Sequence, residues 1–203
     1  MDNPRSLKNM AEREDRLKRR FKSPVAKLNK FVDRVRKKTK KNYHIPYFDP
    51  EDGGVKARCL FLLEAPGRMA VVSGFISRDN DDQTAENFSA EVKDLARKKT
   101  VLWNIVPWYI RKKPNGEIPQ EDIDEGTKYL KRLLRLKDLR RHLRIIVLVG
   151  EKAQRVEDFL RENLRSSKIE VVKMPHPSPQ NRAPEKEKKI RDALNNVVRI
   201  LKR

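Results

Sequence analysis

Side chains that could bind a ligand or move a proton stand at the ends of four short apolar runs in the sequence. Glu64 follows the first run, Asn104 lies near the end of the second, Lys152 follows the third and His176 follows the fourth. A carboxylate can orient water, an amide both donates and accepts hydrogen bonds, and an imidazole can donate to developing negative charge. These positions predict one polar site, provided that the fold brings the ends of the runs together.

The apolar runs alternate with segments of helical period, which is the pattern of a parallel sheet covered by helices on both faces. The predicted strands are residues 58–63, 100–106, 145–149 and 169–174, and the predicted helices are 83–98, 120–143, 152–164 and 185–202. Ligands bind such sheets where the carboxyl ends of the strands open into loops. We therefore expect an α/β fold, a three-layer α/β/α sandwich around a four-stranded parallel sheet, with the site at its carboxyl edge.

The first 43 residues predict a basic helical extension, and residues 44–203 the α/β domain. The extension has 16 Lys or Arg against 5 Asp or Glu, and its apolar residues recur at helical spacing on both sides of Pro24. The whole chain has a net charge of +20, which attracts polyanions, most commonly nucleic acid. We expect the apolar stripe to pack on the domain, and deletion of residues 1–43 to weaken DNA binding while leaving the pocket chemistry intact.

Several classes of protein lack support in this sequence. Cys59 is the only cysteine, so neither an intramolecular disulfide nor a four-cysteine metal site can form. The chain contains no glycine-rich dinucleotide fingerprint, no phosphate loop and no His-Glu-x-x-His zinc motif. It also contains no apolar run of about 18 residues and no apolar signal segment. We expect an intracellular monomer that needs no cofactor or metal and does not bind a membrane.

Four strings in order along the chain resemble the motifs of the uracil-DNA glycosylase superfamily. They are LLEAPGRM at 62–69, SGFIS at 73–77, WNIVPWY at 103–109 and MPHPSPQNR at 174–182. The resemblance implies an enzyme that flips a deaminated base out of DNA, with uracil as the first expectation, and hydrolyses its N-glycosidic bond without a lyase step. The chain departs from the usual motif in having Leu63 where a glycine opens it, and it lacks the cysteines of the iron–sulfur branches.

The resemblance also implies a role for each motif residue in the base pocket. Phe75 would stack on the flipped base, and Asn104 would pair with the N3–H and O4 of uracil while mismatching the amine of cytosine. Ala65, Pro66 and Gly67 would form the turn beneath the base. Phe75 has an alternative interpretation as an ordinary core residue, and Asn104 as a strand cap.

The catalytic groups implied by the resemblance are one histidine and a carboxylate. His176 would donate a hydrogen bond to the uracil oxygen as the base departs. Glu64 could orient water or hold its loop in shape. Asp79, with Asp81 as the fallback, could position the water instead, although residues 79–82 could equally be a solvated turn.

DNA contacts are expected from loops beside the pocket. Ser178 could bind a phosphate, and Gln180, Asn181 or Arg182 could fill the space left by the flipped base. Lys152 at a helix start, and Arg111, Lys112 and Lys113 in a basic loop, would meet phosphates. Two other interpretations stay open: a non-catalytic nucleic-acid-binding protein that retains the fold, and an RNA-binding or ribosome-associated factor.

Overall fold

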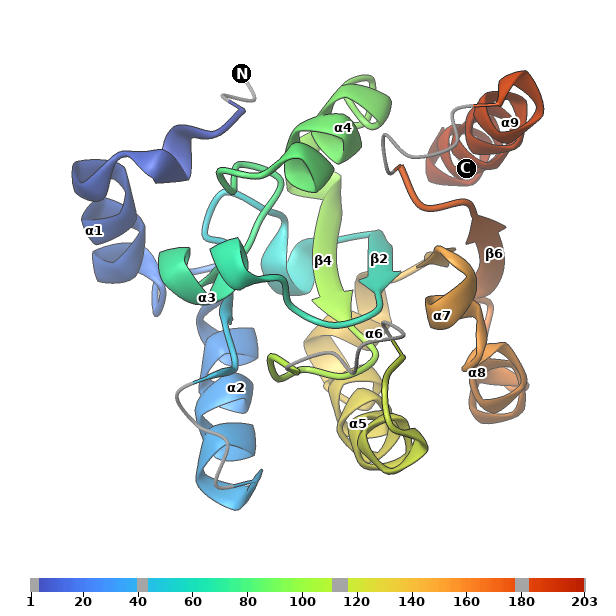
Figure 1. Ribbon diagram of the computed structural model, residues 1–203. Coiled ribbons are helices and arrows are strands. Elements are labelled where there is room, and N and C mark those ends of the chain that lie inside the picture. The colour runs from blue at the N-terminus through green and yellow to red at the C-terminus, as the bar shows by residue number, and fades with distance from the viewer. Residues whose placement is uncertain (1–3, 40–43, 111–116, 178–182, 203) are drawn as a thin grey trace.

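The protein is built around a central parallel sheet, seen in a computed structural model that describes residues 4–39, 44–110, 117–177 and 183–202. The sheet contains β2 (Cys59–Leu63), β4 (Thr100–Asn104), β5 (Ile145–Val149) and β6 (Glu170–Met174) in the order β4-β2-β5-β6 (Figure 1). All three strand pairings are parallel, and Leu63 pairs in register with Asn104. The strand β2, the first of this sheet along the chain, therefore lies inside the sheet, and its carboxyl end lies between those of β4 and β5.

Burial explains why the first three apolar runs form strands. Every residue of β4 and β5 is buried, as is expected for parallel strands covered on both faces. The strand β6, at the other edge of the sheet from β4, is more exposed: Glu170 and Lys173 are exposed, and Val171 and Val172 between them are half-buried. The four predicted strands are confirmed.

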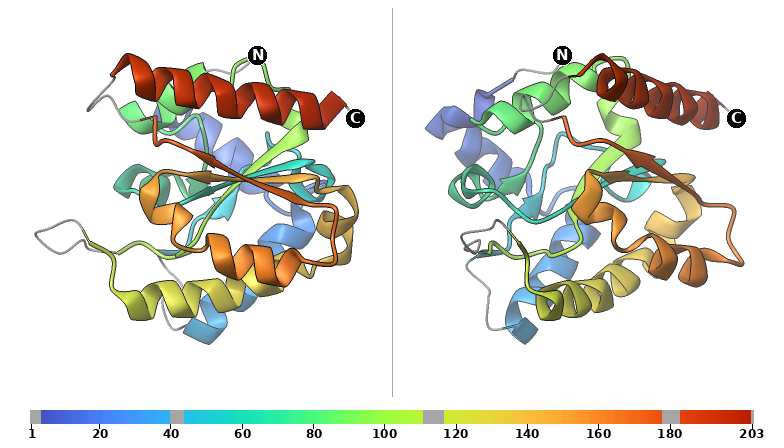
Figure 2. Two further views of the ribbon diagram at one scale, coloured as in Figure 1. Left: turned by 90° about the vertical axis from the view of Figure 1, so that its right-hand side faces the viewer. Right: turned by 45° about the vertical axis from the view of Figure 1, so that its right-hand side comes forward.

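Helices cover both faces of the sheet and complete three layers (Figure 2). The helices α4 (Gln83–Glu91) and α9 (Pro184–Lys202) lie on one face. On the other face lie α2 (Ala26–Thr39), α5 (Gln120–Leu134) and α8 (Glu157–Leu164). The predicted α/β/α sandwich is thus confirmed. No helix in the described ranges is long and apolar enough to cross a membrane.

The second N-terminal helix, α2, belongs to the same core as the sheet. After the short turn η1 (Ser6–Lys8) and α1 (Met10–Arg19), α2 buries Leu28, Phe31, Val32 and Val35 in the main apolar cluster. The Phe31 ring meets the Trp103 ring of β4 edge to face at 6.4 Å. The expectation that this apolar stripe packs on the domain is confirmed. Deletion of residues 1–43 would expose the apolar surface beneath it, and the effect of that deletion on the pocket stays a prediction. The proposed boundary between residues 43 and 44 stays a prediction.

Several short elements differ from the predicted segments. The segment 120–143 divides into α5 and α6 (Lys137–His142), because Leu136 between them is extended, with φ −62° and ψ 113°. The segment 152–164 likewise divides into α7 (Glu151–Gln154) and α8, and α4 ends at Glu91 rather than near residue 98. The sequence pattern did not indicate the six-residue helix α3 (Arg68–Ser73) or the parallel pair β1 (Tyr47–Phe48) and β3 (Phe75–Ile76). The turns η3 (Gly54–Lys56) and η4 (Arg97–Lys99) complete the described elements.

Candidate active site

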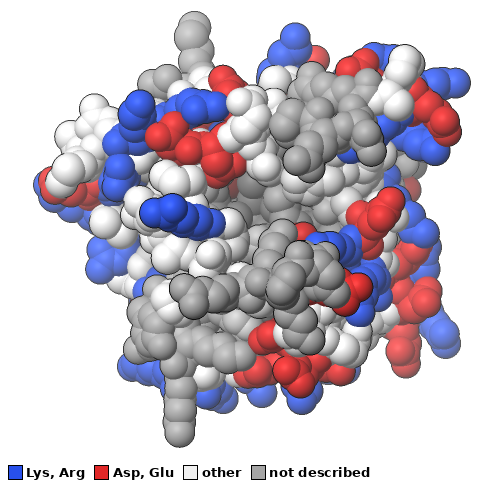
Figure 3. All heavy atoms as spheres, in the orientation of Figure 1, with Lys and Arg blue, Asp and Glu red and all other residues white. Residues whose placement is uncertain are grey.

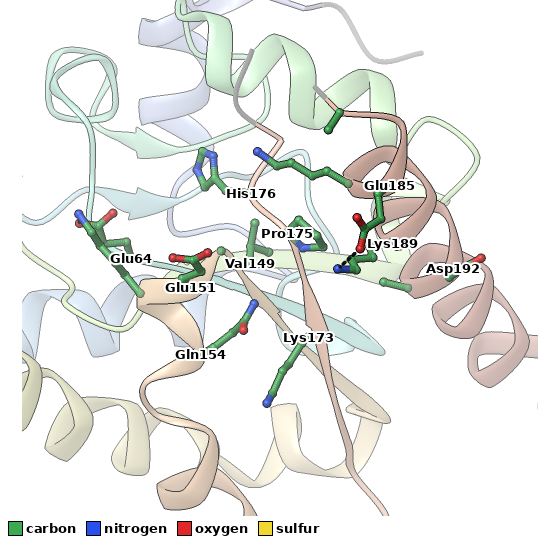
Figure 4. Close-up of a pocket in the computed structure, with 15 residues that line it drawn as sticks. Glu64, Val149, Glu151, Gln154, Lys173, Pro175, His176, Glu185, Lys189 and Asp192 are labelled. Carbon is green, nitrogen blue, oxygen red and sulfur yellow. Dashed lines mark hydrogen bonds and ion pairs between the residues drawn. The ribbon is translucent and has the colours of Figure 1, made fainter. Parts of the chain in front are cut away.

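Two adjoining hollows open at the carboxyl edge of the sheet. The first, here called the central pocket, has a volume of about 530 Å³ and lies between the ends of β2 and β4, α3 and the start of α4. The second, the lateral cleft, has a volume of about 860 Å³ and lies between β5, β6, α7 and α9 (Figure 4). Glu64 and His176 line both. Figure 3 shows that Lys and Arg side chains on this side of the molecule are interspersed with Asp and Glu.

The floor of the central pocket is the turn that follows β2. The backbone N–H groups of Ile105 and Val106 donate to the carbonyls of Leu63 at 2.8 Å and Glu64 at 3.0 Å, so the pairing with the β4 segment continues past the strand end. The chain then turns through Ala65 and Pro66, and Gly67 precedes α3. Ala65, Pro66 and Gly67 all line the pocket, and a Cβ added to Gly67 would meet no atom within 4 Å. The turn therefore leaves room for a ligand on its pocket side.

Asn104 presents an unsatisfied amide to this pocket. It is the last residue of β4 and its exposed fraction is 2%. Within the described part of the chain, its buried Nδ2 has no hydrogen-bond partner. An unsatisfied buried donor costs about 1–3 kcal/mol, and such groups are rare in native proteins. A ligand carbonyl in the pocket would supply the missing acceptor.

His176 is held in place by neighbours from two other elements. It follows β6, and the amide of Asn87 on α4 donates to the next carbonyl, that of Pro177, at 3.0 Å. Gly150, after β5, has φ +83°, and a Cβ there would lie 3.0 Å from the His176 Cβ. The backbone of β5 thus approaches the histidine more closely than a residue with a side chain would allow. The sequence indicated neither Asn87 nor Gly150.

Glu64, which lines both hollows, is paired with Lys152, which lines the lateral cleft. Their side chains form an ion pair with a distance of 3.2 Å between Nζ and Oε1, and both are partly buried. Lys152 lies in α7, which has only four residues, so its helix dipole is small. The lysine holds the carboxylate at the junction of the central pocket and the lateral cleft.

Three predicted site residues lie outside both hollows. Phe75 is fully buried in β3 and packs near the Tyr47 ring of β1, while the next residue, Ile76, lines the central pocket. Asp79 is 1% exposed and pairs with Arg16 at 2.8 Å and Arg97 at 2.7 Å. Asp81 pairs with Arg5 on the outer side. The structure does not bring Phe75, Asp79 or Asp81 into either hollow, because their side chains are packed in the core or paired with arginines, and their roles stay predictions.

Other pocket residues were not predicted from the sequence. Phe88 of α4 is 2% exposed and provides an aromatic wall, while Asp82 lines the pocket and accepts a hydrogen bond from the Ala85 N–H at 2.8 Å. Phe88 lies on the apolar face of a predicted helix, which indicates burial but not a pocket. Among the described residues, no group of three His, Cys, Asp or Glu side chains is placed to hold a metal ion.

The remaining predicted DNA contacts lie outside the described residues. They are Arg111, Lys112, Lys113, Ser178, Gln180, Asn181 and Arg182. Their roles stay predictions. The structure does bring together six of the predicted site residues in the central pocket: Glu64, Ala65, Pro66, Gly67, Asn104 and His176.

A comparison with protein families identifies the group to which this fold and pocket belong. The family model described as the Uracil DNA glycosylase superfamily matches residues 50–200, which is more than half of the chain. The chain belongs to this superfamily. A comparison with curated proteins found no match. Membership in the uracil-DNA glycosylase superfamily supports a glycosylase-type activity on DNA, and the match begins after α1 and α2.

Proposed function

We propose that this protein is a monofunctional DNA glycosylase that binds a flipped-out deaminated base, with uracil preferred, in the central pocket. The observation that carries the proposal is the buried, unsatisfied Nδ2 of Asn104 in a pocket that His176 also lines. A uracil O4 would accept the Asn104 N–H, and the amide oxygen would accept the uracil N3–H. Cytosine would present its amine to the same donor and leave it unsatisfied.

The other pocket residues fit hydrolysis of the glycosidic bond. His176 donates to the uracil O2 as the bond to the sugar breaks and negative charge develops on the base. Water attacks C1′ of the sugar, and a carboxylate accepts its proton. Glu64 and Asp82 are the carboxylates among the described lining residues, and the side chain of Asp82 caps α4. Glu64 is therefore the proposed water-orienting group, with Lys152 holding it in place.

The aromatic contact and the DNA contacts complete the proposal. Phe88, rather than Phe75, supplies the ring on the pocket wall. The DNA on either side of the flipped base would lie along the same edge of the sheet. Lys152 comes shortly after β5 there, and residues 178–182, which come after β6 in the sequence, are proposed to contact the DNA as well. We also propose that the protein binds DNA as a monomer.

The test measures base release from oligonucleotides that contain uracil, hypoxanthine, xanthine or a thymine opposite guanine, followed by alkaline cleavage of abasic sites. We expect release of uracil, and a loss of about 100-fold or more in Asn104→Ala and His176→Ala, the range for removal of one preorganised donor. Asn195→Ala and His142→Ala change exposed residues of the same types on α9 and α6, and should match the unmodified protein.

Two outcomes would count against this function. Binding to DNA without release from any of the four substrates would indicate a non-catalytic protein that retains the fold. Tighter binding to structured RNA than to uracil-containing DNA would favour an RNA-binding role.

A further inference from the structure

The loop formed by residues 77–82, here called the pocket loop, separates the central pocket from the N-terminal segment. It joins β3 to α4. On one side, Arg78, Asn80 and Asp82 line the central pocket. On the other, Asp79 and Asp81 contact the N-terminal segment of residues 5–19. The loop is thus a single layer of chain between the pocket and that segment.

Three residues of the N-terminal segment, Arg5, Leu7 and Arg16, attach it to this loop. The backbone N–H of Leu7 donates to the Asp79 carbonyl at 3.1 Å, and Leu7 itself is 1% exposed. Arg5 pairs with Asp81 at 3.4 Å and with Glu86 of α4 at 2.8 Å. Arg16 on α1 pairs with the Asp79 carboxylate at 2.8 Å. Both ends of the segment therefore bind the pocket loop, and Arg5 also binds the helix that follows it.

Arg16 is the central residue of this attachment. Its exposed fraction is 3%, and it also pairs with the fully buried Asp49 at 2.6 Å and with Glu12 at 2.7 Å. Burial by itself would lower the pKa of Arg16, but the carboxylates of Asp49 and Asp79 outweigh it and raise that pKa. The guanidinium therefore stays charged, and its planar fork fixes two carboxylates from separate segments in one geometry.

We propose that Arg16 is a positioning residue for the central pocket and that the N-terminal segment is a structural part of the active site. The segment lies outside residues 50–200, which match the glycosylase family. Asp79 is adjacent to Arg78 and Asn80, so a shift of Asp79 moves two residues of the pocket wall. The catalytic consequence of this proposal rests on the proposed glycosylase function, while the control of the loop's position does not.

Variants of Arg16 test the proposal by hydrogen–deuterium exchange of residues 77–82 and by steady-state kinetics of uracil release. We expect Arg16→Gln to raise exchange in the pocket loop by about tenfold or more. Its kcat/KM should fall by about 10- to 100-fold, as for a small misplacement of a binding group. Arg16→Lys keeps the charge without the fork and should recover part of both losses.

Arg19→Gln is the matched control. Arg19 lies on the same helix and pairs with Asp15 and Glu51, which are outside the pocket loop. We expect its loop exchange and kcat/KM to stay within about twofold of the unmodified protein, as is usual for partly exposed ion pairs.

A milder variant keeps the test decisive if Arg16→Gln fails to fold. Arg5→Gln removes a pair whose arginine is 40% exposed, and it should still raise exchange in residues 79–86. Unchanged loop exchange in Arg5→Gln and in every folded Arg16 variant would overturn the positioning role. An unmodified protein that releases no base would overturn the proposed function alone, since loop exchange still reports on the attachment.

Discussion

At the scale of single residues, the position of His176 depends on the absence of a side chain at Gly150. A Cβ on Gly150 would lie 3.0 Å from the His176 Cβ and 3.4 Å from its Cδ2. The glycine also has φ +83°, a conformation that other residues adopt only at a cost. The imidazole therefore packs directly on the backbone that leaves β5, which restricts the orientations open to it.

We predict that Gly150→Ala lowers uracil release by about tenfold or more, because the histidine must move away from its place in the pocket. Gly74→Ala is a control that also places alanine at a positive φ, since Gly74 has φ +81° and ψ 5° and its added Cβ would meet Leu17 at 3.8 Å. Gly74→Ala should lose about 1–2 kcal/mol of unfolding free energy, and Gly150→Ala should lose more, because Gly150 has ψ 158°, a combination that residues other than glycine rarely adopt. Equal activity of the two variants, measured at a temperature where both are fully folded, would show that Gly150 does not position His176.

At the scale of elements, α4 joins the pocket to the loop that contains His176. Phe88 of α4 lines the central pocket, and Asn87 donates to the Pro177 carbonyl at 3.0 Å. Gln83, one turn earlier, donates to the Asn87 side-chain oxygen at 2.9 Å and so orients the amide. Movement of α4 would therefore displace the pocket wall together with residues 175–177, here called the histidine loop.

We predict that Asn87→Ala lowers kcat/KM for uracil release by about tenfold, because the histidine loop loses its attachment to α4. The expected loss of unfolding free energy is about 1 kcal/mol. Asn163→Ala on α8 also removes a side-chain hydrogen bond to a backbone carbonyl, that of Phe159 at 2.7 Å, and Asn163 lines neither hollow. Thermal unfolding and steady-state kinetics of both variants separate the two effects; a similar loss of activity in both would contradict a specific role for Asn87.

The strands could be predicted because buried parallel strands are continuous apolar runs in the sequence, whereas the short elements and irregular loops could not be predicted. An all-apolar run such as Ile145–Val149 can be read directly as an inner strand, and Asn104 and His176 then meet because parallel strands end at one edge. Two-residue strands and a six-residue helix have too few positions to show a period. For the same reason, the sequence could not indicate that Phe75 and Asp79 point away from the pocket.

At the scale of the whole molecule, a buried charge cluster joins the N-terminal helix to the α/β domain. Arg97 of η4 pairs with Asp49 at 2.9 Å, Asp52 at 3.0 Å and Asp79 at 2.7 Å, while Arg16 of α1 pairs with Asp49 and Asp79. All three aspartates have exposed fractions of 1% or less. Stability of the molecule therefore depends on the protonation of groups that do not themselves line the central pocket.

The pKa of Asp52 determines whether the unfolding free energy rises or falls with pH. Burial raises the pKa of Asp52 to about 7, with Asp49 adding to the rise and Arg97 opposing it. The unfolded chain has the ordinary aspartate pKa of about 3.9. Between these values the folded state holds a proton that the unfolded state lacks, so this group makes the unfolding free energy fall as the pH rises from about 4 to about 7.

We predict that Asp52→Asn removes this part of the pH dependence, because the amide is neutral at every pH and can still accept a hydrogen bond from Arg97. Relative to the unmodified protein, the variant should therefore gain stability between pH 5 and pH 8, in urea unfolding measured at fixed ionic strength. Asp158→Asn on α8 changes an exposed carboxyl and should leave the curve parallel to that of the unmodified protein. A parallel curve for Asp52→Asn as well would mean that Asp52 is already ionised at pH 5, with Arg97 compensating its burial in full.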